Sequence, residues 1–144
     1  MGEVRTSRAA DLPAIRALLA DAGLPVEGVD ALGEDLIVTE ERGRVVGAVG
    51  MERRGDVALL RSLVVDPTLR ACGIGATLCD ALLTRAAAAD VREVWLLTET
   101  AEPFFRRHGF ETVSRDAAPE AIRRTDEFSR ICPGSATIMR KRVG

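Results

Sequence analysis

The fold is decided by residues 63–76, which read LVVDPTLRACGIGA: an apolar run, a proline, and a pair of glycines that begins three residues after an arginine. Pro67 cannot donate to a β-ladder, so the apolar strand ends just before it. From Ile74 onward, apolar side chains recur every four positions, which predicts a helix to about residue 89. The stretch therefore predicts a buried strand, a glycine-containing turn and a helix, in that order.

The predicted turn has the composition of an anion-binding site. The first turn of a helix leaves several N–H groups without intrahelical acceptors, and the helix dipole adds partial positive charge there. Gly73 and Gly75 let a phosphate approach the backbone, and Arg70 adds a charged donor. The alternative is a helix entered through a tight glycine turn with no ligand. The strand before, the helix after and the arginine upstream together favour ligand binding.

Two other phosphate-binding patterns fit less well. A P-loop requires a lysine directly after its second glycine, and the single lysine of this chain is Lys141. A dinucleotide fingerprint places its first glycine near the first strand and carries a third glycine, which the residues after Gly75 lack. Both patterns are therefore disfavoured.

Hydrophobic periodicity and turn residues predict the elements outward from this stretch. Asp11 and Pro13 start a helix that ends near Gly23, and Pro119 starts another. Residues 26–34 read either as a short helix or as a loop. The fold class is α/β (α+β), because hairpins joined by glycine turns precede a strand–helix–strand unit. The predicted strands are 3–6, 35–40, 44–52, 56–65, 93–98, 110–114 and 135–141, and the predicted helices are 12–22, 74–89, 101–107 and the one after Pro119.

Length and composition predict a single domain over residues 1–144, with 47% hydrophobic and 29% charged residues. A net charge of -2 and scattered basic residues give no reason to expect nucleic acid as a partner. The first residues lack the apolar core of a secretory peptide, and no apolar stretch approaches the ~20 residues that span a bilayer, so we expect a cytoplasmic protein without a membrane partner. Cys72, Cys79 and Cys132 lack the paired spacings of a zinc site, so we expect reduced thiols and no metal.

Two motifs carry a family resemblance. Residues 63–76 resemble motif A of the GNAT N-acetyltransferases, and residues 101–110 (AEPFFRRHGF) resemble their second signature. Within that superfamily the chain most closely resembles the acetyltransferases of arsenic-resistance operons, through residues 59–63 (LLRSL), 96–105 (LLTETAEPFF) and 119–136 (PEAIRRTDEFSRICPGSA). A more distant likeness is to the acetyltransferase domain of N-acetylglutamate synthases.

The resemblance implies the GNAT fold, with acetyl-CoA as the cosubstrate. This fold has a mixed, mostly antiparallel central sheet of about seven strands and about four helices. Strands 4 and 5 would splay after Val65 and Thr98, and the pantetheine arm of the coenzyme would enter the gap as an additional strand. The implied coenzyme-binding residues are Leu63, Val65, Arg70, Ala71, Cys72, Gly73, Ile74, Gly75, Ala76 and Phe105.

The resemblance also implies direct attack of a neutral amine on the thioester. The backbone amide of Val65 would stabilise the oxyanion, and Glu99 is favoured over Glu52 as the base that accepts the amine proton. Many GNAT enzymes use a tyrosine as the acid, four residues before the glycine of Gly-Phe. That position is Phe105 here, and the chain contains no tyrosine. We therefore expect a working enzyme without a dedicated tyrosine acid.

For the acceptor, the resemblance implies a small amino-acid-like amine. The candidate substrate-binding residues are Arg61, Ser62, Thr98 and Ser135. Arg61 and Ser62 are adjacent in a strand, so their side chains are expected on opposite faces. An arginine in an apolar strand needs a partner, and a substrate carboxylate, Asp56 or Glu52 would each supply one.

Two other functions are compatible with these motifs. One is a non-catalytic acetyl-CoA-binding sensor, which the missing tyrosine favours. The other is acetylation of protein N-termini or lysines. This function requires an open groove, whereas residues 115–134 are expected to cover the substrate site. A homodimer through a strand edge at 135–141 and a role in arsenic resistance both stay open.

Overall fold

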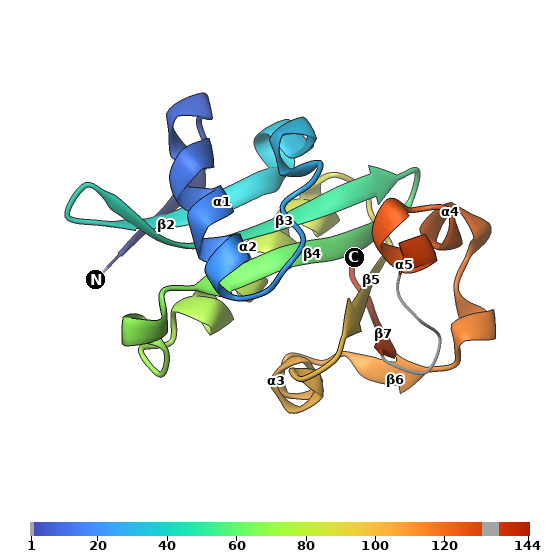
Figure 1. The fold of residues 1–144 in the computed structure, drawn as a ribbon. Helices are drawn as coiled ribbons and strands as arrows, with labels where there is room; N and C mark the ends of the chain where they lie inside the picture. The colour runs from blue at the N-terminus through green and yellow to red at the C-terminus, as the bar shows by residue number, and fades with distance from the viewer. Residues whose placement is uncertain (1, 131–135) are drawn as a thin grey trace. The chain divides into compact units, whose positions relative to one another are not determined.

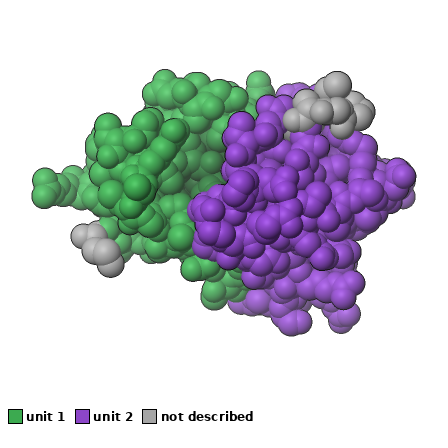
Figure 2. All heavy atoms as spheres, turned by 90° about the horizontal axis from the view of Figure 1, so that it is seen from below, with its two compact units in different colours: residues 1–52, 60–85 green, residues 53–59, 86–144 purple. Residues whose placement is uncertain are grey.

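A seven-stranded sheet runs through the computed structural model, which describes residues 2–130 and 136–144. The strand order is β1-β2-β3-β4-β5-β7-β6, with β4 parallel to β5 and antiparallel pairing at β1–β2, β2–β3, β5–β7 and β6–β7 (Figure 1). The chain divides into two compact units, residues 1–52 with 60–85 (unit 1) and residues 53–59 with 86–144 (unit 2) (Figure 2). The predicted mixed, mostly antiparallel sheet is confirmed.

The predicted strands are present within two residues of their predicted limits. They are β1 (Glu3–Thr6), β2 (Leu36–Glu41), β3 (Arg44–Arg54), β4 (Val57–Val65), β5 (Glu93–Thr98), β6 (Glu111–Val113) and β7 (Thr137–Arg142). The α-helices are α1 (Leu12–Asp21), α2 (Ile74–Ala88), α3 (Glu102–Arg107), α4 (Glu120–Arg123) and α5 (Asp126–Arg130). Short 3-10 helices lie at η1 (Ala9–Asp11), η2 (Val29–Asp35), η3 (Pro67–Leu69) and η4 (Arg115–Ala117).

Two segments differ from the prediction. The ambiguous stretch at 26–34 forms the 3-10 helix η2, with a kink at Gly33. The single helix expected after Pro119 is two short helices, because the buried Thr125 interrupts it. Its hydroxyl donates to the carbonyl of Ile122 at 2.7 Å and accepts the amide of Phe128 at 3.3 Å, so it competes with the helical hydrogen bonds. The described residues therefore contain five α-helices where about four were expected.

In unit 1, helices pack on two faces of the strands. Ala48 of β3 belongs to the core on the α1 side, whereas its neighbour Gly47 faces α2, as the two-residue repeat of a strand requires. The α1-side core consists of Ile15, Leu19, Val29, Leu36, Val38, Ala48 and Val64. Burial of each large aliphatic side chain contributes roughly 1.5–3 kcal/mol, so this core fixes β4 within unit 1.

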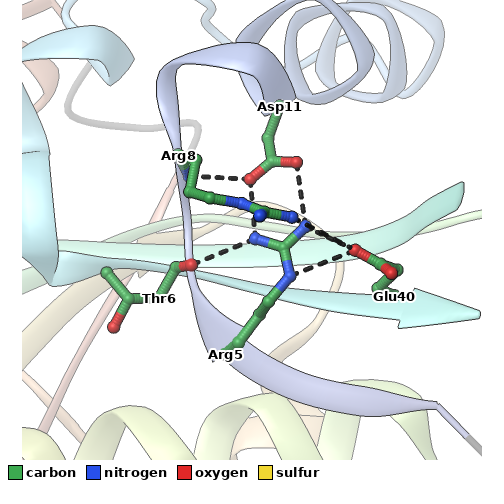
Figure 3. A network of polar contacts seen from close by, with 5 residues as sticks. All are labelled: Arg5, Thr6, Arg8, Asp11 and Glu40. Atoms are coloured by element: carbon green, nitrogen blue, oxygen red, sulfur yellow. Dashed lines mark hydrogen bonds and ion pairs between the residues drawn. The ribbon is translucent and has the colours of Figure 1, made fainter. Parts of the chain in front are cut away.

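An arginine-centred network ties β1 to the start of α1 (Figure 3). Arg5 donates to both carboxylate oxygens of Asp11 at 2.8 and 3.0 Å, and to Glu40 of β2 at 2.6 and 3.1 Å. Asp11 also accepts the amide of Arg8 at 2.7 Å. Asp11 holds the N-cap position of α1, as predicted, but its carboxylate makes no capping bond to that helix, because it bonds to Arg5 and to the amide of Arg8, which closes η1. The hydrogen bonds from Arg5 hold the pKa of Asp11 below its ordinary value.

Replacing Asp11 by asparagine is expected to lower the free energy of unfolding by about 1.5–3 kcal/mol at neutral pH, the contribution of hydrogen bonds to a charged group. Because the pKa of Asp11 is lowered in the folded state, its contribution is complete above the unfolded pKa of about 3.9 and is lost as the pH falls through the lower folded value. Urea unfolding at neutral and acid pH measures this difference, which should shrink in acid. Asp21→Asn, at an exposed position of the same helix, is the control.

In unit 2, β5 pairs with two neighbours. Residues 57–59 of β4 lie parallel to residues 93–95, and the whole of β5 pairs antiparallel with β7. The core of this unit contains Val57, Leu59, Trp95, Ala118, Ile122, Phe128 and Ile138. The splaying of strands 4 and 5 stays a prediction.

Candidate active site

Asp66 fixes the point where β4 ends and the turn begins. Its amide donates to the carbonyl of Val46 at 2.8 Å, and its Oδ1 accepts the amide and the hydroxyl of Thr68 at 2.9 and 2.7 Å. Arg44 lies 3.3 Å from its other oxygen. The hydrogen bonds from Thr68 are the main reason why the pKa of Asp66 lies below its ordinary value. The carboxylate therefore stays charged and anchors the following turn to β3.

The turn itself has two residues in the left-handed conformation, Ala71 with φ 74° and Gly73 with φ 80°. A Cβ on Gly73 would meet no atom within 4 Å, so glycine is required there for backbone conformation and not for space. Residues 70–73 are exposed, as an anion site requires. Thr77 of α2 donates through its hydroxyl to the carbonyl of Gly73 at 3.0 Å, which couples the turn to the helix. Among the predicted coenzyme-binding residues, Ile74 is buried and Gly75 and Ala76 are half-buried.

The first turns of α2 pack directly against Gly47 of β3. A Cβ at this position would lie 3.0 Å from Leu78 Cδ1, 3.1 Å from Ile74 Cγ2 and 3.1 Å from the carbonyl oxygen of Val64. Only a residue without a side chain lets the helix approach β3 and β4 this closely. This role of Gly47 could not be predicted from the sequence, because a glycine in a strand carries no signal of which helix packs on it.

Replacing Gly47 by valine is expected to cost about 1–3 kcal/mol of stability through overpacking and to weaken coenzyme A binding, because the helix start must move. Gly50→Val in the same strand is the matched control. Its Cβ would meet Leu32 and Leu36 instead of α2, so it should destabilise comparably and leave coenzyme A affinity unchanged. Thermal unfolding and calorimetric titration with coenzyme A separate the two effects. Equal losses of affinity in both variants would contradict the assigned role of Gly47.

The strand before the turn is irregular at Ser62, whose φ is 63°. A left-handed residue inside a strand is a feature of β-bulges and bends the strand locally. Leu63 and Val65, the predicted partners of the pantetheine arm, lie beyond this point and are half-buried, while Val64 between them is in the core. The irregularity at Ser62 therefore lies directly before the strand segment that would carry the coenzyme.

The side chains of Arg61 and Ser62 were predicted to point to opposite faces of the strand, and they do not. The Nε of Arg61 donates to the Ser62 hydroxyl at 3.1 Å, because the left-handed backbone at Ser62 breaks the alternation of side chains. Arg61 also donates to Glu52 at 2.8 Å and to the carbonyl of Glu27 at 2.7 Å. Of the partners considered from the sequence, Glu52 holds the arginine. The contact with Glu27 was missed, although the adjacent Gly28, with φ 79°, lies against the guanidinium.

The remaining predicted site residues lie in unit 2 or outside the described residues. Thr98 accepts the amide of Ala101 at 2.9 Å, so its hydroxyl closes the turn from β5 into α3. Glu99 is exposed on that turn. Phe105 is 5% exposed and packs edge-on against the Phe104 and Phe110 rings, which places most of it in the core of unit 2. Ser135 and Cys132 lie outside the described residues.

Residues 2–130 and 136–144 contain neither a metal-binding cluster nor a membrane-spanning helix. No group of three or more histidine, cysteine or acidic side chains is arranged to hold a metal ion there. None of the helices described is both long and apolar enough to cross a membrane. Cys72 is exposed in the turn, and Cys79 is buried in α2.

Comparison with known sequences places these features in one family. Residues 33–112 match the family model described as an acetyltransferase (GNAT) domain. The chain is also 30% identical, over 141 residues, to an amino-acid acetyltransferase of Mycobacterium tuberculosis (strain ATCC 25618 / H37Rv). That match covers 88% of this chain and 77% of the relative.

Solved structures show the same fold. Rv2747 from Mycobacterium tuberculosis, in complex with CoA and NLQ, superimposes with a TM-score of 0.85 at 25% identity, over 99% of both chains. The N-acetylglutamate synthase of Neisseria gonorrhoeae, complexed with coenzyme A and N-acetyl-glutamate, gives a TM-score of 0.85 at 23% identity. That match covers 100% of this chain and 35% of the synthase chain, so the chain spans about a third of that relative's length.

Proposed function

This chain belongs to the GNAT family of acetyltransferases and is an N-acetyltransferase; from that premise we propose that it moves the acetyl group of acetyl-CoA to the amine of a small amino-acid-like acceptor. The sequence relative is an amino-acid acetyltransferase. The structural relatives were solved with coenzyme A, one of them together with N-acetyl-glutamate. These relatives support an amino-acid-like acceptor over a protein N-terminus.

The observation that carries the proposal is the turn at residues 70–76. Its residues 70–73 are exposed, its backbone is left-handed at Ala71 and Gly73, and it leads into the 15-residue helix α2. The first-turn amides of such a helix and the neighbouring Arg70 fit the pyrophosphate of coenzyme A in charge and donor number. These residues would hold the diphosphate, and Leu63 and Val65 would pair with the amides of the pantetheine arm.

The proposed reaction depends mainly on holding the amine next to the thioester of acetyl-CoA. The amine nitrogen forms a bond to the thioester carbon, the carbon–sulfur bond breaks, and coenzyme A leaves as a thiolate that takes up a proton. Holding the two reactants together supplies about 7–11 kcal/mol of the barrier. The Val65 amide would stabilise the oxyanion, worth roughly 10²–10³ in rate. Glu99 is the proposed base, since the alternative carboxylate, Glu52, is bonded to Arg61.

Phe105 stands where many family members carry a tyrosine acid, and its ring packs among other rings. A thiolate is a tolerable leaving group near neutral pH, because thiols have a pKa of about 8.5. We propose that the enzyme works without a tyrosine acid. Because most of its surface is covered, Phe105 would contact the coenzyme through its remaining edge alone.

The decisive experiment is thiol release from acetyl-CoA against a panel of amines. The panel contains the common amino acids, their α-amides, an arsenic-containing amino-acid analogue and an N-terminal peptide. Turnover on free amino acids is the expected result. Tight coenzyme A binding without turnover on any amine would favour a sensor, and faster turnover of the peptide would favour a protein acetyltransferase. Selective turnover of the arsenical would support the link to arsenic resistance.

A cytoplasmic location and a homodimer stay part of the proposal. Reduced thiols and an acetyl-CoA-dependent reaction are consistent with the cytoplasm. Sedimentation at micromolar concentration tests the dimer.

A further inference from the structure

Arg115 of η4 carries a buried nitrogen without a hydrogen-bond acceptor. Its Nη2 has lost its contact with solvent, and no acceptor for it is present in the described part of the chain. The guanidinium carbon lies 4.6 Å from the centroid of the Phe128 ring, which is 4% exposed. Leaving a charged donor buried and unbonded is costly, and native structures rarely retain such a group without a reason.

Other buried or half-buried arginines have their charges balanced by carboxylates of the same chain. Arg61 bonds to Glu52, and Arg5 bonds to Asp11 and Glu40. Arg140, which also stacks on an aromatic ring and whose Nε is also buried without an acceptor, forms an ion pair with Glu111 through Nη2. Arg115 stands apart, since no ion pair joins it to a carboxylate among residues 2–130 and 136–144.

The strand register of unit 2 places Arg115 at a chemically relevant end of the sheet. Val113, the last residue of β6, lies opposite Ile138 of β7, which on its other side lies opposite Leu97 of β5. The next pair along β7 joins Thr137 to Thr98, where β5 ends. Arg115, two residues beyond Val113, therefore follows β6 at the same sheet end at which Thr98 leads into the turn of Glu99.

We infer that Arg115 binds the carboxylate of the amino-acid-like acceptor, an inference that rests on the proposed function. A guanidinium stacked on an aromatic ring presents its planar fork edge-on, and a carboxylate is the planar acceptor that matches two parallel N–H groups. A single arginine balances one negative charge, which fits a carboxylate better than a phosphate dianion. Arg61, the carboxylate receptor considered from the sequence, already has Glu52 as its partner.

The test compares each amino acid with its own α-amide, in which a neutral group of similar size replaces the carboxylate. Comparing variant with wild type on each substrate cancels the lower pKa of the amide's α-amine. For the best amino acid in the panel, Arg115→Met is expected to lower kcat/KM by about 10- to 100-fold, chiefly through a higher KM, as loss of a hydrogen bond to a charged group predicts. Turnover of the matched α-amide should change by less than about threefold, because its neutral group makes no ion pair. Arg115→Lys should recover part of the discrimination.

Two controls separate this role from a structural one. Arg123→Met, at an exposed position of the neighbouring helix α4, should leave both substrates unaffected. Thermal unfolding of Arg115→Met should occur at or above the wild-type temperature, because an uncompensated buried donor is removed. Equal losses for acid and amide, no loss for either, or a lowered unfolding temperature would each overturn the inference while leaving acetyl transfer intact. If the wild-type protein acetylates no amine at all, this result would contradict both the proposed function and the inference.

Discussion

Replacing Gly73 by valine is expected to weaken coenzyme A binding by about 100-fold, with little change in the unfolding temperature. The loss corresponds to one or two hydrogen bonds to a charged ligand, about 3 kcal/mol in total. Gly73 has φ 80°, a conformation that a β-branched residue cannot adopt without strain. The turn would change shape to relieve the strain, and the amides of Ile74 and Gly75, the proposed diphosphate donors, would lose their present arrangement. The residue is exposed, so the core stays intact.

Gly23 offers a matched control for this experiment. It has φ 72°, and a Cβ there would also meet no atom within 4 Å, so Gly23→Val carries the same backbone strain without touching the turn. Gly73→Asn is a second comparison, because asparagine tolerates the left-handed region. Isothermal titration with coenzyme A should rank the affinities as wild type and Gly23→Val together, then Gly73→Asn, then Gly73→Val. Unchanged affinity in Gly73→Val would contradict the assignment of the diphosphate to this turn.

The turn was predictable because its geometry is local. Pro67 ends a strand, the glycines permit left-handed backbone, and the apolar repeat from Ile74 starts a helix, so the order of elements follows from neighbouring residues alone. The same locality explains why the strand limits were close to those observed. Thr125, by contrast, breaks the helix after Pro119 through a side-chain bond that hydrophobic periodicity does not register.

The candidate acceptor residues were less predictable because their geometry is not local. The alternation rule placed Arg61 and Ser62 on opposite faces, and a single left-handed residue at position 62 overturned it. No pattern in LLRSL marks a left-handed residue. The contact of Arg61 with the Glu27 carbonyl joins residues 34 positions apart, and the contact of Arg115 with the Phe128 ring joins residues of two separate helices.

Replacing Arg61 by methionine is expected to lower the free energy of unfolding by about 3–5 kcal/mol, the cost of removing one partner of a buried ion pair. Arg61 is 6% exposed and donates to Glu52, to the Glu27 carbonyl and to the Ser62 hydroxyl. Methionine fills much of the same volume, so the loss reports the polar contacts and not a cavity. The segment at residues 27–28 and the irregular backbone at Ser62 would then lose their common anchor.

A double-mutant cycle in urea distinguishes this ion pair from a general packing effect. The double variant Arg61→Met with Glu52→Met should lose less unfolding free energy than the two single variants together. Arg61→Met alone leaves the Glu52 carboxylate without its arginine, and Glu52→Met removes that carboxylate. Arg16→Met is the control, since Arg16 lies 3.9 Å from Asp30 in an exposed pair and should cost less than about 1 kcal/mol. Strict additivity in the cycle, or a loss for Arg61→Met no larger than that of the control, would show that this buried charge does not anchor the strand.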